Sequence, residues 1–144
     1  MTETIASILK RKGHGIYSVA PDAPVHDAIT MMAEKGVAAV LVMAGEKLVG
    51  IVSAKDYGSR VVLQGRSAKD TRVREIMTSP VATVTLELSV PECMAIMTGR
   101  HFRHLPVVDK GELVGVVSMG DLASALISDQ AFHIDQLMTY VGQK

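Results

Sequence analysis

The apolar and polar positions of this chain follow an order that recurs 65 residues further along. The apolar residues of segment 25–32 lie three or four positions apart, which is typical of one buried helix face, and those of segment 90–97 repeat the spacing. Segments 48–52 and 113–117 are short, apolar and β-branched, which favours buried strands. Such an internal repeat predicts one supersecondary unit made twice, each copy being strand–helix–strand–strand–helix.

The Gly and Pro residues that interrupt this pattern set the expected boundaries. The first copy is expected over residues 8–64 and the second over 73–128, with the polar segment 64–72 as the linker. Because a half of this size is marginal alone, we expect an α+β fold in which the two β-α-β-β-α copies pack as one pair. The expected elements are strand 16–19, helix 25–35, strands 37–43 and 48–52 and helix 53–63, then strand 81–84, helix 90–100, strands 102–108 and 113–117 and helix 121–128.

Short helices are expected to flank the pair at both ends of the chain. The first covers residues 2–12 and is capped by Thr2 or Thr4. The last covers residues 129–144 and is capped by Ser128 or Asp129. Its expected apolar stripe consists of Ile134, Leu137, Met138 and Val141.

Composition excludes several functional classes. The 144 residues include 15 basic and 15 acidic side chains, and the zero net charge argues against a nucleic-acid or membrane-surface binder. No apolar run reaches the ~18 residues of a membrane helix. The N-terminus shows no secretory signal pattern, so a cytoplasmic location is expected. The single cysteine excludes an internal disulfide, and Cys93 is expected to be an inert core residue.

A Ser-x-x-Asp motif follows the last strand of each copy. It comprises Ser53 and Asp56 in the first copy, and Ser118 and Asp121 in the second. At the start of a helix this spacing is typical of a capping box, and taken alone it favours that interpretation. A cap does not exclude a ligand, because other backbone N–H groups of the first turn remain free to bind one.

The chain resembles a tandem pair of cystathionine-β-synthase (CBS) domains, of the stand-alone kind. The resemblance rests on Gly-Ile-Val-Ser-x-x-Asp at 50–56, Gly-Val-Val-Ser-x-x-Asp at 115–121, Ile-Met-Thr at 76–78 and His-Leu-Pro-Val-Val-Asp at 104–109, and it extends over roughly residues 8–127. It implies clefts between the two motifs that bind an adenosine-containing ligand. AMP, ATP or NAD is expected, and S-adenosylmethionine is less favoured. It also implies a homodimer, and it leaves open whether the dimer is parallel or antiparallel.

The residue chemistry fits such a ligand. An ionised carboxylate can accept hydrogen bonds from both ribose hydroxyls, and Asp56 and Asp121 match the family positions for this role. The Ser53 and Ser118 hydroxyls, with the N–H groups of the following helices, are expected at a phosphate. Adenine needs an apolar slot with backbone partners. The residues that match this slot are Ile16, Tyr17, Ala38, Ala39, Thr78, Pro80 and Val81.

The two copies differ in their cations. Arg103 and His104 interrupt an apolar run and are expected at a phosphate, with a salt bridge or an exposed strand end as the alternative. Their counterparts in the first copy are alanines, whereas Lys55 has only Gly120 as its counterpart. Two adenosine sites of unequal affinity, or sites for two different ligands, are therefore expected. Arg60 is expected at a phosphate, at a carboxylate or on a solvated helix face.

No catalytic constellation stands out in the sequence. The five histidines and the cysteine lack metal-ligand spacing, and no phosphate loop or hydrolase elbow occurs. The expected function is a non-enzymatic regulatory module that senses adenine nucleotides. The alternative is a structural CBS dimer that binds a client protein. The excess of apolar helix faces, at 25–32, at 90–97 and in the last helix, favours a homodimer.

Overall fold

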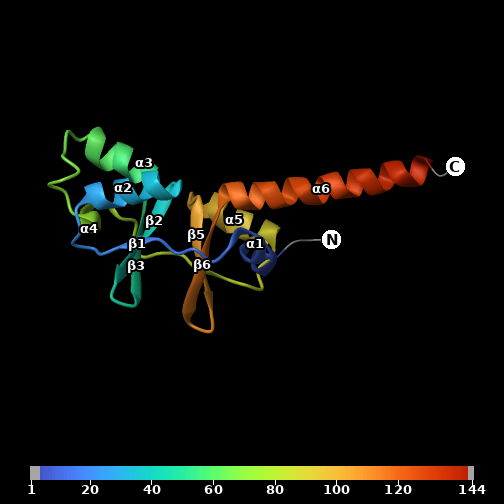
Figure 1. Cartoon of the computed structure of the whole chain (residues 1–144), viewed down its shortest axis with the longest axis horizontal. Coiled ribbons are helices and arrows are strands. Elements are labelled where there is room, and N and C mark those ends of the chain that lie inside the picture. The colour runs from blue at the N-terminus through green and yellow to red at the C-terminus, as the bar shows by residue number, and fades with distance from the viewer. Residues whose placement is uncertain (1–3, 143–144) are drawn as a thin grey trace. The chain divides into compact units, whose positions relative to one another are not determined.

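The chain folds into two compact units that differ from the two sequence repeats. The computed structural model describes residues 4–142, apart from the side chains of residues 129, 131–133, 135–136 and 139–142 in the last helix. One unit contains residues 16–82, and we call it the central unit. The other, which we call the terminal unit, joins the described residues up to Gly15 to those from Thr83 onward. Each unit has one three-stranded sheet and its own helices (Figure 1).

The central unit is built on the sheet β1-β2-β3. Strands β1 and β2 are parallel because a helix connects them, whereas β2 and β3 form an antiparallel hairpin. The strands are β1 (Ser18–Val19), β2 (Ala39–Ala44) and β3 (Lys47–Ser53), and the helices are α2 (Val25–Lys35), α3 (Ala54–Tyr57), the π-helix η1 (Gly58–Val62) and α4 (Val73–Ile76).

The terminal unit repeats this topology in the sheet β4-β5-β6. Even the irregularity of the hairpin recurs, since the register shifts at Val42/Met43 in one unit and at Val107/Val108 in the other. The strands are β4 (Val84–Thr85), β5 (His104–Asp109) and β6 (Glu112–Ser118), and the helices are α1 (Ile5–Lys12), α5 (Val90–Arg100) and α6 (Met119–Gly142). The predicted α+β class and the duplicated order of elements are confirmed.

Helices α2 and α5 have the predicted bounds, because their apolar faces and their ends are encoded locally. Val25, Ala28 and Met32 are buried in α2, and the equivalent residues of α5 are buried as well. Each helix ends at a residue in the left-handed conformation, Gly36 or His101. These two faces are covered inside their own units. The inference of a homodimer from segments 25–32 and 90–97 therefore loses its basis.

The segment that opens each repeat packs in the unit of the other repeat. α4 opens the second repeat in sequence, but it belongs to the central unit, where Thr78 forms a β-bridge with Ile51 of β3. α1 opens the first repeat, but it packs against β6 and α6 in the terminal unit. Thr4 caps α1, as predicted, by accepting a hydrogen bond from the Ser7 amide.

Several predicted elements differ from the structure. The helix expected over 53–63 has nearly these bounds, but it is α for one turn only and continues as the π-helix η1. The strands expected over 16–19 and 81–84 are short, and they cover only Ser18–Val19 and Val84–Thr85. Ser128 and Asp129 do not cap a separate helix, because α6 runs without a break through both positions and extends well past its sheet (Figure 1). The side chain of Val141 lies outside the described residues.

Candidate functional site

In the central unit, β3 runs into α3 through a turn closed by Ser53 and Asp56. Ser53 Oγ accepts a hydrogen bond from the Asp56 amide at 3.2 Å. In return, Asp56 Oδ2 accepts from the Ser53 amide at 2.9 Å and from Ser53 Oγ at 3.0 Å. This is the predicted capping box, and the Asp56 side chain remains only half-buried.

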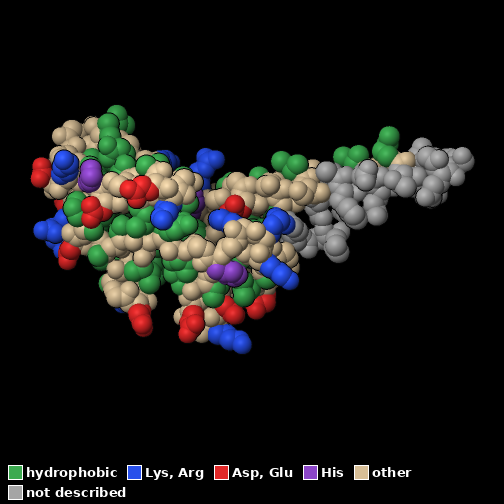
Figure 2. Space-filling model, in the orientation of Figure 1, with side chains coloured by type: hydrophobic (Ala, Val, Ile, Leu, Met, Phe, Trp, Pro, Cys, Tyr) green, Lys and Arg blue, Asp and Glu red, His purple; other side chains and the backbone are tan. Residues whose placement is uncertain are grey.

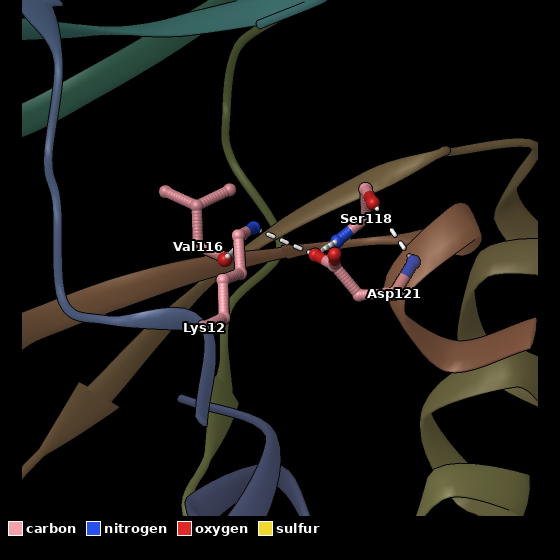
Figure 3. A network of polar contacts seen from close by, with 4 residues as sticks. All are labelled: Lys12, Val116, Ser118 and Asp121. Atoms are coloured by element: carbon pink, nitrogen blue, oxygen red, sulfur yellow. Dashed lines mark hydrogen bonds and ion pairs between the residues drawn. The ribbon is translucent and has the colours of Figure 1, made fainter. Parts of the chain in front are cut away.

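The terminal unit makes the same turn between β6 and α6. Ser118 Oγ accepts from the Asp121 amide at 3.0 Å, and Asp121 Oδ2 accepts from the Ser118 amide at 2.8 Å. The same Oδ2 also accepts from Lys12 Nζ at 2.6 Å (Figure 3). Burial acts to raise the pKa of the Asp121 carboxyl, but the hydrogen bonds from Lys12 and Ser118 outweigh it and hold that pKa below its usual value.

A backbone hydrogen bond in each unit ties the start of the middle strand to the start of the helix. The Ala54 amide donates to the Ala38 carbonyl at 2.9 Å, and the Met119 amide donates to the Arg103 carbonyl at 2.8 Å. The residue before each middle strand therefore lies beside the Ser-Asp turn of its own unit. The family resemblance implies that Ala38, Arg103 and the Ser-Asp turns all contribute to ligand sites. Within each unit, the structure places the residue before the middle strand next to the turn.

Arg103 and His104 lie at the beginning of a strand. β5 begins at His104, and the Arg103 side chain just before it is exposed, so no buried arginine needs a partner there. His104 is half-buried. Burial is the main cause that lowers the pKa of its imidazole, and the nearby Lys12 and Arg103 charges add to this against an opposing effect of Asp121.

The residues expected to form the adenine slot all belong to the central unit. Ile16 is exposed, and Tyr17 packs against the core of the central unit. The Lys35 ammonium lies over the Tyr17 ring, 5.6 Å from its centroid. Thr78 reaches β3 through the bridge to Ile51, Pro80 is exposed and Val81 is half-buried. The slot segment of the second repeat thus shares a compact unit with Asp56 and not with Asp121.

Two cations have roles that the sequence did not predict. Arg60 Nη1 donates to the Ile76 carbonyl at 2.8 Å and to the Met77 carbonyl at 3.3 Å, so it stabilises the end of α4. Arg60 is exposed, and among the described residues it bonds to no carboxylate. Lys12 bonds to Asp121 across 109 residues of sequence. The available signal was its place in the repeat, since Lys12 precedes Met77 by the repeat distance and replaces an apolar residue with a charge.

Other kinds of site find no support in the part of the chain that the structure describes. Among those residues, no three His, Cys, Asp or Glu side chains come together to hold a metal ion. Among the same residues, no helix combines the length and the apolar character that crossing a membrane requires. Lys55 is exposed, and within the described residues it forms no ion pair.

Comparison with known proteins identifies the class. The model of the CBS domain family matches residues 5–57 and 73–128, so the chain belongs to this family and carries two copies of the domain. It is 35% identical over 147 residues to the mitochondrial CBS domain-containing protein CBSX3 of Arabidopsis thaliana, covering 96% of this chain and 71% of the relative. Pairs of CBS domains are generally regulatory and ligand-binding, and stand-alone proteins of this kind are typically not catalytic.

Solved structures agree with this assignment. A CBS-domain protein from Burkholderia ambifaria superposes with a TM-score of 0.85 at 50% identity, covering 89% of this chain and 96% of that one. A hexameric CBS-CP12 protein from bloom-forming cyanobacteria superposes with a TM-score of 0.77 at 28% identity, covering 85% of this chain and 67% of that one.

Proposed function

We propose that this chain is a regulatory module that binds an adenine nucleotide such as AMP, ATP or NAD. In this proposal, the Asp56 and Asp121 carboxylates accept hydrogen bonds from the ribose hydroxyls. The observation that carries the proposal is the way in which the two caps are made. Within the described residues, the capping bonds of each aspartate use Oδ2, so Oδ1 is available as an acceptor for a ligand. Capping and ribose binding are therefore compatible at the same side chain.

The same turns offer donors for a phosphate. The first amide of each helix donates to the residue before the middle strand, and the third donates to the capping serine. The second amides, those of Lys55 and Gly120, are not used by these bonds, and helical geometry gives them no intrahelical partner. In the terminal unit, the Arg103 backbone is hydrogen-bonded to this turn and its side chain is exposed, which supports the expected phosphate role of its guanidinium.

Binding should first be measured on the unmutated protein with AMP, ATP, NAD and S-adenosylmethionine. A ligand present at 100 times its dissociation constant adds about 2.7 kcal/mol to the free energy of unfolding, which a thermal shift detects. The 2′-deoxy and 3′-deoxy forms of the best ligand then remove one hydroxyl at a time. A charge-assisted hydrogen bond contributes about 1.5–3 kcal/mol, so losing one hydroxyl should weaken binding about 10- to 100-fold.

Two substitutions at each aspartate separate the cap from the ligand site. Asp121→Asn keeps a side-chain oxygen that can accept from the Ser118 amide, but it removes the charge, so we expect weaker binding with little loss of stability. Asp121→Ala removes both functions, and losing a cap costs about 1 kcal/mol of stability. Asp56→Asn and Asp56→Ala repeat the test in the central unit. The proposal is rejected if the alanine variants melt earlier while all four variants bind the nucleotides as tightly as the unmutated protein.

A second candidate function is a module for protein interaction, and one observation favours it. Ile127, Ile134, Leu137 and Met138 are 63–67% exposed along α6. Figure 2 shows hydrophobic side chains along the protruding part of this helix. The positions 127, 134 and 138 follow the spacing of a seam between two helices. A second copy of α6 would present the same seam, so we propose that α6 mediates a homodimer.

A further inference from the structure

Lys12 connects the end of β6 to the start of α6. Its ammonium donates to the Val116 carbonyl at 2.9 Å and to Asp121 Oδ2 at 2.6 Å (Figure 3). The Lys12 side chain is 42% exposed and that of Asp121 is 23% exposed, so the pair is partly shielded from water. The aspartate proposed for ribose binding in the terminal unit is therefore already paired with a cation of the protein.

The central unit lacks this arrangement. Ile51 is the counterpart of Val116 in the repeat, and its carbonyl accepts from the Thr78 backbone amide at 2.9 Å. A neutral backbone donor thus replaces the ammonium of Lys12 at the same position of the strand. Within the described residues, Asp56 accepts hydrogen bonds from Ser53 alone and has no cationic partner.

This difference has a direct consequence for a ligand. The Lys12 ammonium donates a charge-assisted hydrogen bond to Asp121 Oδ2. In the proposed function, the ribose uses Oδ1, the other oxygen of the same carboxylate. A ribose hydroxyl that approaches Asp121 meets a carboxylate whose charge is partly neutralised. The same hydroxyl meets an unneutralised carboxylate at Asp56. The two aspartates are therefore unequal acceptors although their capping turns are the same.

We propose that Lys12 competes with the ribose for the Asp121 carboxylate, so that the terminal unit binds a nucleoside more weakly than the central unit does. The inference rests on the proposed function, because it assumes that both aspartates accept from ribose. It makes Lys12 a residue that determines the relative affinity of the two units. α1 carries this residue, so any change that moves α1 away from β6 would raise the affinity of the terminal unit.

The test isolates the terminal unit by using an Asp56→Asn background and follows binding by calorimetry. Adenosine and AMP are the two probes, because adenosine has the ribose without the phosphate. Partly exposed ion pairs contribute little free energy, and this small contribution corresponds to about a two- to fivefold change in affinity. We expect Lys12→Met to tighten the binding of both probes by this factor. Lys12→Gln should do the same while keeping a neutral donor for the Val116 carbonyl.

Two controls make the result specific. Lys10→Met removes the same charge from an exposed position of the same helix and should leave both affinities unchanged. In an Asp121→Asn background, which leaves only the central unit, Lys12→Met should also have no effect.

Three outcomes would overturn the inference. If Lys12→Met weakens AMP binding and leaves adenosine binding unchanged, Lys12 holds the phosphate. If it lowers the melting temperature and changes neither affinity, the ion pair is structural only. If the unmutated protein binds neither probe, the proposed function fails and the inference fails with it, a result distinct from the first two.

Discussion

Gly115 of β6 faces Leu9 of α1 so closely that a Cβ atom at position 115 would lie 2.8 Å from Leu9 Cδ2. The same relationship exists in the central unit, where a Cβ at Gly50 would lie 2.5 Å from Met77 Sδ. In both units, a glycine in the last strand lets the segment that opens the other repeat pack on the sheet. The exchange of these segments between the repeats therefore depends on two residues without a side chain.

Gly115→Ala should destabilise the terminal unit. Leu9 is fully buried, so it has little room to move away from an added methyl group. Overpacking of this kind costs about 1–3 kcal/mol, which should lower the urea midpoint of unfolding. Gly99→Ala is the matched control, because position 99 lies inside α5 with open space around it. It should raise stability by about 0.5–1 kcal/mol. Equal effects of the two substitutions would contradict the close contact.

The stability of the protein should fall in acid partly because of Asp121. Its pKa is lower in the folded chain than in the unfolded chain, where it takes its usual value. The carboxylate therefore stabilises the fold above about pH 4, and this contribution is lost as the pH falls through the folded pKa. Urea unfolding at several pH values should show a smaller acid loss for Asp121→Asn. Lys12→Met should also reduce the acid loss, since Lys12 is a cause of the shift. An unchanged pH profile in both variants would contradict this role of the ion pair.

Cys93 should resist thiol reagents while the protein is folded. The side chain is fully buried in α5, and burial raises the pKa of its thiol to about 11. Since the thiolate is the reactive form, labelling at pH 8 should be slow in native buffer and fast in concentrated urea. The labelling rate then reports the opening of the terminal unit. Complete and rapid labelling of the native protein would show that α5 does not cover the thiol.

The α6 stripe should control the oligomeric state. We expect Ile134→Lys and Met138→Lys to shift the protein toward the monomer in analytical ultracentrifugation, because each places a charge in the proposed seam. Ser128→Lys is the control, since Ser128 is exposed and lies about 100° around the helix from Ile127. A monomer of the unmutated protein at micromolar concentration would contradict the homodimer.

Local features of the sequence were sufficient for much of the fold. The bounds of α2 and α5 follow from an apolar face of helical period and a residue that can adopt the left-handed cap. The two Ser-Asp turns follow from a capping spacing of three residues. Less was predictable at the chain's last helix. Ser128 and Asp129 have side chains suited to capping, but nothing before them breaks the helix, so α6 continues through both.

The duplication of one α+β unit is readable from the sequence, because hydrophobic period, caps and turns act between residues a few positions apart. Which unit receives α1 and α4 is visible only in the folded chain, and this packing pairs Lys12 with Asp121 while Asp56 has no cationic partner within the described residues. The difference comes from the range of the interaction. An ion pair across 109 residues depends on where a whole segment packs, and the local pattern around either residue does not contain that information.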